Sequence, residues 1–169
     1  WLRNDSRNIC WMEEITMKNK WLVAVMALLL VVLAGCGDKE YKPKAINPET
    51  DVCKVCNMSI THANYAGQIV FKNNDHLIFD DLGCLMEYIV ENGEDEIGAA
   101  FIVEENSHKW INVKDAVYVY NKDFWTPMNY GVLAFDTEEG ANEYMAANGQ
   151  GELLSYDDLY DFNWGVHTH

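Results

Sequence analysis

The stretch FDDLGCLMEYIVENG, residues 79–93, decides the fold because it recurs as FDTEEGANEYMAANG at residues 135–149. The two stretches align without a gap at a shift of 56 residues and are identical at six of 15 positions. In the first copy, Leu82, Leu85, Met86 and Ile89 recur at the spacing of one helix face. Asn-Gly closes each copy as a C-terminal helix signal. The repeat predicts two similar helices in a duplicated fold.

Runs typical of β-strands surround both predicted helices. The alternation Val117-Tyr118-Val119-Tyr120, for example, combines β-branched and aromatic residues. We expect strands at residues 68–71, 76–79, 99–103, 108–112, 116–120, 132–135 and 152–155. The predicted fold class is α+β, with two tandem pseudo-symmetric ββαβ units at residues 51–107 and 108–160 and a C-terminal tail at 161–169. Its core should bury Leu85, Ile89, Ala141 and Met145.

The N-terminal part has the features of a secretion signal. A basic start at 17–20 precedes an apolar run at 21–34, which as a helix would span about 21 Å, less than the hydrocarbon core of about 30 Å. This length favours a signal peptide over a membrane span. The run ends Leu33-Ala34-Gly35-Cys36, which resembles a bacterial lipobox and implies cleavage before Cys36 and a lipid on its sulfur. The alternative is a plain cleaved signal with an incidental cysteine.

The flanking segments follow from this interpretation. Residues 1–16 begin without Met and carry acidic residues where a signal peptide is basic, so we expect them to be upstream sequence joined to a start at Met17. The signal peptide would be residues 17–35, and the polar residues 36–50 would form a membrane tether. The protein would then be an extracytoplasmic, membrane-anchored lipoprotein of a bacterial cell envelope.

The remaining chain is strongly acidic. Residues 36–169 contain 8 basic and 24 acidic residues, a net charge of −16. Such a surface repels nucleic acid, which excludes a nucleic-acid-binding function, and it attracts cations. The simpler interpretation, that the acidity serves solubility, stays open.

Three cysteines remain after Cys10 and Cys36 are set aside: Cys53, Cys56 and Cys84. A structural zinc site normally takes four ligands, so a zinc site here would have to add Cys84 and a distant histidine to the CxxC pair. A thioredoxin-like redox motif needs CxxC at the start of a helix after a core strand, a context that this sequence does not predict. Cys84 lies off the apolar stripe of its helix, so we expect it to be half-buried and not a ligand.

Met58 distinguishes copper from these alternatives. A thiolate and a thioether form a soft ligand pair that selects Cu(I) over harder ions. In an extended segment Cys56 and Met58 would point to the same side, so one ion could bridge them. The alternative is that Met58 only fills the core.

Further copper ligands could come from three places. Cys53 is the less certain candidate of the CxxC pair, and His62 follows closely in the sequence. Met128 precedes a strand of the second unit much as Met58 precedes the strands of the first, so it is a candidate too. We expect Met86 to lie in the core, and Asp80 and Asp81 to supply the helix N-cap and first-turn charge.

The order of motifs resembles the NosL family, copper-chaperone lipoproteins associated with maturation of nitrous oxide reductase. The resemblance runs from about Asp51 to Asp158 and rests on the lipobox, CxxCxM, FDDLGCLMEY and TPM followed by GVLAF. It implies two pseudo-symmetric ββαβ units and one Cu(I) site formed by Cys56 and Met58. The sequence departs from the family at Asn57 and Asn129, where glycine is usual, and the third ligand is left open. Asn tolerates a positive φ, so the turn can survive.

We therefore expect a membrane-tethered Cu(I) metallochaperone and not an enzyme. Its partners would be the membrane, through the lipid anchor, and a copper-receiving apo-enzyme, which the resemblance suggests is nitrous oxide reductase, with its assembly proteins. The alternative function is an extracytoplasmic thiol redox or zinc-binding lipoprotein. A third class, an inert interaction module, would hold its CxxC as a disulfide.

Overall fold

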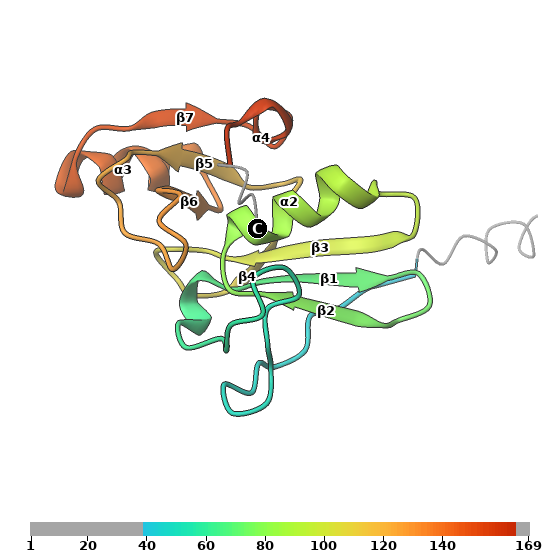
Figure 1. The fold of residues 1–169 in the computed structure, drawn as a ribbon. Coiled ribbons are helices and arrows are strands. Elements are labelled where there is room, and N and C mark those ends of the chain that lie inside the picture. Colours follow the sequence, from blue (N-terminus) through green and yellow to red (C-terminus); the bar gives the residue numbers. More distant parts are fainter. Residues whose placement is uncertain (1–38, 165–169) are drawn as a thin grey trace, which may run out of the picture. The chain divides into compact units, whose positions relative to one another are not determined.

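The computed structural model describes residues 39–164, of which Tyr41 onward form one compact unit. Figure 1 shows helices and strands in succession along this unit. The elements are η1 (Ala63–Tyr65), β1 (Gly67–Phe71), β2 (His76–Phe79), α2 (Leu82–Asn92), β3 (Ile97–Val103), β4 (Trp110–Asn112), β5 (Val117–Tyr120), β6 (Val132–Phe135), α3 (Glu138–Asn148), β7 (Glu152–Leu154) and α4 (Asp158–Asp161). The predicted α+β class is confirmed.

The two predicted units have the same strand order. The first sheet is β2-β1-β3-β4 and the second is β6-β5-β7, with every pairing antiparallel. In each unit the first strand lies between the second and the strand that follows the helix. Gly67 pairs with Phe79 in the first sheet, and Val117 pairs with Phe135 in the second. The pseudo-symmetric ββαβ arrangement follows from this shared order and register.

The helices repeat with the spacing seen in the sequence. The bounds of α2 and α3 differ by 56 residues at both ends. Asp81 caps α2 by accepting from the Cys84 N–H, and Thr137 caps α3 by accepting from the Gly140 N–H, which satisfies N–H groups that have no partner in the helix. A glycine with positive φ follows each helix, as the Asn-Gly pairs predicted.

The core lies around α2. The helix buries Leu82, Leu85, Met86 and Ile89 in a cluster that also contains residues of both sheets, and Figure 1 shows α2 between those sheets. Full burial of each such side chain stabilises the fold by about 1.5–3 kcal/mol. A smaller cluster around Phe135 holds α3 through Ala141 and Met145. All four residues predicted to be buried, and Met86, lie in these cores.

The structure of some peripheral segments differs from the expectations based on the sequence. Residues 108–112 were expected to open the second unit, but β4 pairs with β3 and extends the first sheet. Part of the expected tether is docked, because the Lys44 backbone exchanges two hydrogen bonds with the buried Gln68 side chain. At the other end Trp164 is buried and donates to the Leu159 carbonyl.

Several sequence-based expectations fall outside the described residues. These are the upstream segment at residues 1–16, the signal peptide, the lipobox with Cys36, and residues 165–169 of the C-terminal tail. Within residues 39–164, no helix has the length and apolar character needed to cross a membrane.

Candidate metal centre

The CxxCxM motif forms a closed turn and not an extended segment. The Cys53 N–H donates to the Met58 carbonyl at 2.8 Å, and the Asn57 N–H donates to the Cys53 carbonyl at 3.1 Å. Asn57 has φ 59°, a left-handed conformation that asparagine tolerates better than most residues. Asn129 likewise has φ 61°. The expectation that alternation in an extended chain aligns Cys56 with Met58 is therefore wrong, because the turn sets their positions.

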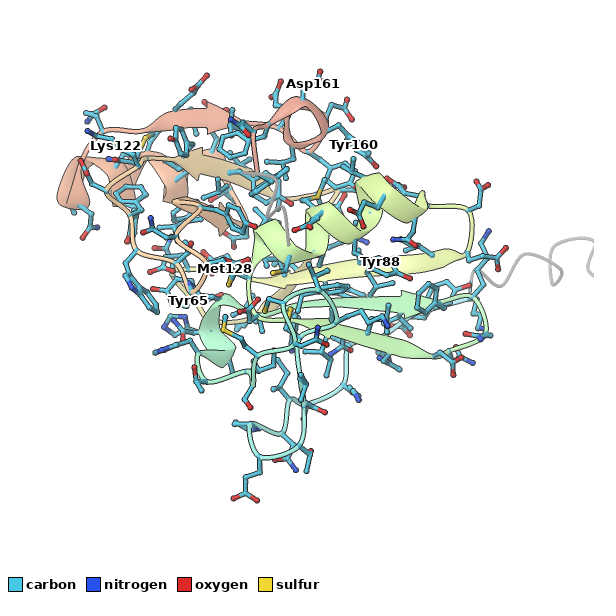
Figure 2. The ribbon with its side chains drawn as sticks, in the orientation of Figure 1. Tyr65, Tyr88, Lys122, Met128, Tyr160 and Asp161 are labelled. Atoms are coloured by element: carbon cyan, nitrogen blue, oxygen red, sulfur yellow. The ribbon has the colours of Figure 1, made fainter. Side chains whose placement is uncertain are left out.

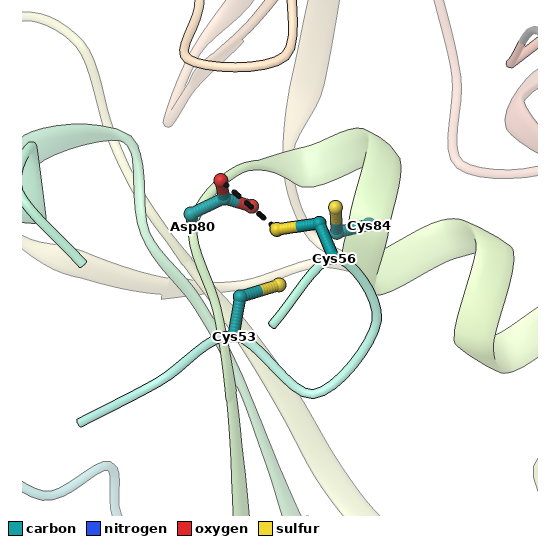
Figure 3. Close-up of side chains that lie close together, drawn as sticks. All are labelled: Cys53, Cys56, Asp80 and Cys84. Carbon is teal, nitrogen blue, oxygen red and sulfur yellow. Dashed lines mark hydrogen bonds between the residues drawn. The ribbon is translucent and has the colours of Figure 1, made fainter. Parts of the chain in front are cut away.

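Four potential metal ligands meet at this turn. The sulfur atoms of Cys53, Cys56 and Cys84 and a carboxylate oxygen of Asp80 all lie within 4.8 Å of one another. Figure 3 shows the turn bringing its two cysteines against the end of β2 and the start of α2. The Cys56 thiol donates to Asp80 Oδ2 at 3.4 Å, and no disulfide joins the three cysteines.

Cys84 corrects the sequence analysis. We expected a half-buried residue apart from the site, but Cys84 is fully buried within the cluster. The apolar stripe predicts only which side chains face the sheets, whereas Cys84 lies three residues after the N-cap Asp81, in the first turn of α2. A first-turn position next to a strand end was the signal that could have placed it near the CxxC loop. Asp80 is likewise part of the cluster rather than a simple first-turn charge.

The three thiols have different proton affinities. The pKa of Cys53 is lowered to about 7, because the Cys84 thiol donates to its sulfur and the N–H groups of Cys56 and Asp80 point at it, which together outweigh burial. Cys84, which keeps the shared proton, has a raised pKa. Burial raises the pKa of Cys56 to about 12. Cys53 is therefore the first thiol of the cluster to ionise.

Met58 lies at the surface of the site. Its side chain is 47% exposed, which contradicts the alternative that it fills the core. Its backbone N–H donates to the Cys56 sulfur, so the two residues are in direct contact through the turn. A thioether at the solvent edge of a buried thiol cluster is open to a soft metal ion or to a partner's ligand.

The other candidate ligands lie toward one loop, residues 121–131, between β5 and β6. The exposed His62 ring contacts Trp125 of this loop, with ring centroids 4.9 Å apart. Met128, half-buried, donates its N–H to Asp81 Oδ2 at 3.0 Å, which ties the loop to the N-terminus of α2. Tyr65 also contacts Trp125, and Figure 2 labels Tyr65 and Met128 at this side of the unit.

The supposed equivalence of Met128 and Met58 is wrong. Met58 precedes β1, whereas Met128 lies in the loop between the first two strands of its unit. The 56-residue shift of the repeat already maps Met128 onto Lys72, which lies in the loop between β1 and β2. Met128 approaches the first unit through the Asp81 hydrogen bond and not through pseudo-symmetry.

Burial also changes the pKa of Asp81, whose carboxylate connects the start of α2 with the loop at residues 121–131. It raises the Asp81 pKa to about 6, even though the carboxylate accepts from the N–H groups of Cys84 and Met128. Asp80, the residue before Asp81, is buried beside the thiols as well. The site concentrates negative charge where a cation would be stabilised.

Comparison with known proteins agrees with this fold. The chain is similar to the crystal structure of the copper chaperone NosL from Shewanella denitrificans, with a TM-score of 0.62 and 18% sequence identity. The similarity covers 71% of this chain and 96% of that chain. No curated protein matched the sequence. The NosL family model matches residues 43–162, which include both ββαβ units and the thiol cluster, and the chain therefore belongs to the NosL family.

Proposed function

We propose that this protein is an extracytoplasmic copper chaperone, anchored to the membrane by a lipid on Cys36, that binds Cu(I) and transfers it to an apo-enzyme. The observation that carries the proposal is an exposed thioether, Met58, in the same tight turn as Cys53 and Cys56, two of the three clustered thiols. Family membership and the copper chaperone of the same fold support it.

Cys56 and Met58 are the proposed primary ligands. Cys56 is only partly buried, whereas Cys53 and Cys84 are enclosed by the protein, so Cys56 is the thiol that an ion at the Met58 edge reaches first. Thiolate and thioether sulfur match the softness of Cu(I), and Cu(I) accepts two or three ligands. Cys53, His62 and Met128 are candidates for the third position.

Transfer by ligand exchange fits this arrangement. A partner ligand can approach from the Met58 side and replace the neutral thioether before the thiolate is released. The protein performs no bond chemistry in this role, which is why we propose a carrier and not an enzyme. The acceptor that the family suggests is nitrous oxide reductase, working with its assembly proteins.

Copper binding should depend on pH in a way that reports the ligands. Burial raises the Cys56 pKa to about 12, so Cu(I) must displace a proton from Cys56 at any pH near neutrality. One released proton makes the affinity rise by about tenfold per pH unit. If Cys53 were also a ligand, a second proton would be released below its pKa of about 7, and the slope would steepen there.

The decisive experiment is a Cu(I) competition titration of the reduced protein and three variants. Wild type should bind one Cu(I) per chain, and Cys56→Ser should weaken binding by more than about 100-fold, beyond the usual effect of losing an outer-shell partner. Met58→Leu keeps the volume but removes the sulfur, so it should weaken Cu(I) binding while the stability of the apo-protein stays nearly unchanged. Cys53→Ser is the matched control and should have the smaller effect of the two cysteine variants.

The opposite pattern of variant effects would favour the alternative function, a thiol redox or zinc-binding lipoprotein. Equal losses in Cys53→Ser and Cys56→Ser, together with a silent Met58→Leu, are expected of a redox pair or a zinc site. The anchor is tested separately by mass spectrometry of the mature protein. A chain that begins at a lipid-modified Cys36 supports the anchor, and an intact peptide across residues 34–37 contradicts it.

A further inference from the structure

The cluster contains more donors than a Cys–Met copper pair uses. Cys53, Cys84 and Asp80 are not needed by that pair, yet their ligand atoms lie with the Cys56 sulfur in a group no wider than 4.8 Å. Cys53 and Cys84 are 1% and 0% exposed. Two buried thiols, one partly buried thiol and a buried carboxylate converge here from two separate segments of the chain, the turn and the β2–α2 junction.

Asp80 is the informative member of the group. Its side chain is 4% exposed, and its Oδ1 atom has no hydrogen-bond partner within residues 39–164. Its other oxygen, Oδ2, accepts from the Cys56 thiol and from no other group in the described part of the chain. No ion pair within the same residues includes Asp80. An uncompensated buried carboxylate is costly, and a bound cation would remove that cost.

The donor set selects the kind of cation. Three thiolates and one carboxylate give four ligands, the number that a closed tetrahedral zinc site requires, and zinc accepts both sulfur and carboxylate oxygen. A tetrahedron with metal–sulfur bonds of about 2.3 Å has edges of about 3.8 Å, so the donors need to move together by about 1 Å at most. Cu(I) has little affinity for a carboxylate, and its single charge would offset less of the negative charge.

We propose that Cys53, Cys56, Cys84 and Asp80 form a tetrahedral site for a divalent ion of the zinc type, distinct from the Cys56–Met58 copper pair. Backbone hydrogen bonds hold the segments that carry these four ligands, which we call the inner site. The Lys54 N–H donates to the Ile78 carbonyl of β2 at 2.9 Å, which holds the CxxC turn against the strand that leads into Asp80. The Asp81 cap fixes the first turn of α2 and with it Cys84.

Sharing Cys56 has a functional consequence. Both ions would draw on the Cys56 sulfur. We therefore expect a zinc-type ion at the tetrahedral site to weaken Cu(I) binding at the Met58 pair, and Cu(I) to weaken binding of the zinc-type ion. The inner site does not depend on the proposed copper transfer and would stand if that proposal failed.

Cobalt(II) is a suitable probe because it replaces zinc in tetrahedral sites and its absorption reports thiolate ligands. The reduced full chain should bind one Co(II), with intense thiolate-to-metal charge-transfer bands and tetrahedral ligand-field bands, and Zn(II) should displace it. Weak octahedral bands, or a spectrum that Zn(II) does not change, would overturn the proposal.

Two nearly isosteric variants separate the inner site from the copper pair. Asp80→Asn should weaken Zn(II) and Co(II) binding by at least about tenfold, and it should weaken Cu(I) binding less, because Asp80 contacts the copper pair only through the Cys56 thiol. Met58→Leu should do the reverse. If Asp80→Asn leaves Co(II) affinity and spectrum unchanged, Asp80 is not a ligand and the four-ligand site is wrong.

Cys84→Ser tests the buried thiol directly and should reduce the charge-transfer intensity by about a third, as expected for one of three thiolates. Circular dichroism of the apo-variant controls for folding. If this variant does not fold, the wild-type charge-transfer intensity decides, since it must correspond to three thiolates. Failure of wild type to bind Cu(I) would remove the copper function but would leave these Co(II) results as they stand.

Discussion

The two ββαβ units share one fold, but only the first carries a candidate metal centre. Residues 108–160 contain no cysteine, whereas residues 51–107 contain three. At equivalent places of the repeat, Asp80 corresponds to Asp136 and Cys84 to Gly140. The second unit therefore keeps the helix start and its cap but lacks the sulfur.

The two units also differ in which of their equivalent residues are buried. Asp80 is buried beneath the CxxC turn, whereas its counterpart Asp136 is exposed. The helix α2 buries six residues and α3 only two, because α2 packs between both sheets while α3 lies against its own sheet. The same local structure becomes a site only where a second segment covers the helix start and adds donors.

The largest expected effect compares the two cores. Phe79 and Phe135 are equivalent in the repeat and both are fully buried. Replacing either by alanine should lower the free energy of unfolding by about 3–5 kcal/mol, measured by chemical denaturation. Phe79→Ala should also weaken metal binding, because Asp80 follows it directly, whereas Phe135→Ala should preserve the metal affinity of the folded protein. Equal losses of metal binding in both variants would contradict the separation of the units.

The two helix caps should differ in their response to pH. Burial raises the Asp81 pKa to about 6 from its ordinary value of 3.8, whereas its counterpart Thr137 does not titrate. The folded state thus holds this proton more tightly than the unfolded chain. The contribution of Asp81 to stability is fully present below about pH 4 and is lost as the pH rises through about 6. The loss amounts to about 3 kcal/mol at most.

Asp81→Asn checks this difference, since asparagine is also a good N-cap. The variant also loses the hydrogen bond from the Met128 N–H, but the direction of the pH dependence is unchanged, because burial outweighs this bond in its effect on the Asp81 pKa. Unfolding free energies of wild type and variant at pH 4.5 and 7.5 should therefore shift relative to each other, in favour of the variant at the higher pH. A constant difference between the two proteins would show that Asp81 has an ordinary pKa.

The smallest effect concerns the contact between the units. A Cβ atom added at Gly83 would overlap the ring of Tyr130, which itself packs against Trp164. Gly83→Ala should therefore destabilise the protein by about 1–3 kcal/mol, despite the higher helix propensity of alanine. The equivalent residue of α3, Glu139, is exposed, and Glu139→Ala should change stability by less than about 0.5 kcal/mol. Thermal melting of both variants provides the comparison.

Local sequence predicted the regular elements because their causes are local. The 56-residue repeat placed both helices, since capping residues and Asn-Gly pairs act within one turn. Strands β2 and β6 begin and end at the expected residues. The segment 108–112 was expected to be a strand, but its sheet could not be predicted, because pairing to β3 is a long-range choice.

The candidate site divides in the same way. The residue types of CxxCxM predict a soft metal site at Cys53, Cys56 and Met58, and the structure places the two cysteines in a group of potential metal ligands. The resemblance already allowed a positive φ at Asn57, but the residue types could not reveal that the turn closes against β2, because that depends on the long-range hydrogen bond from Lys54 to Ile78. The prediction for Cys84 was wrong because the apolar stripe of α2 indicates only which side chains face the sheets. It gives no information about a loop that covers the first turn of the helix.

The sequence by itself determined the duplicated α+β fold, the acidic charge and the thiol and thioether chemistry, because periodicity, caps and ligand softness are properties of short segments. Only the tertiary structure decided which donors meet. Cys53 and Cys84 are separated by 30 residues, and they come together because the turn is bonded to β2 while α2 begins where β2 ends. The same packing buries Asp80, and a carboxylate needs a hydrogen-bond or cation partner once water is excluded, because an unpaired buried charge costs free energy.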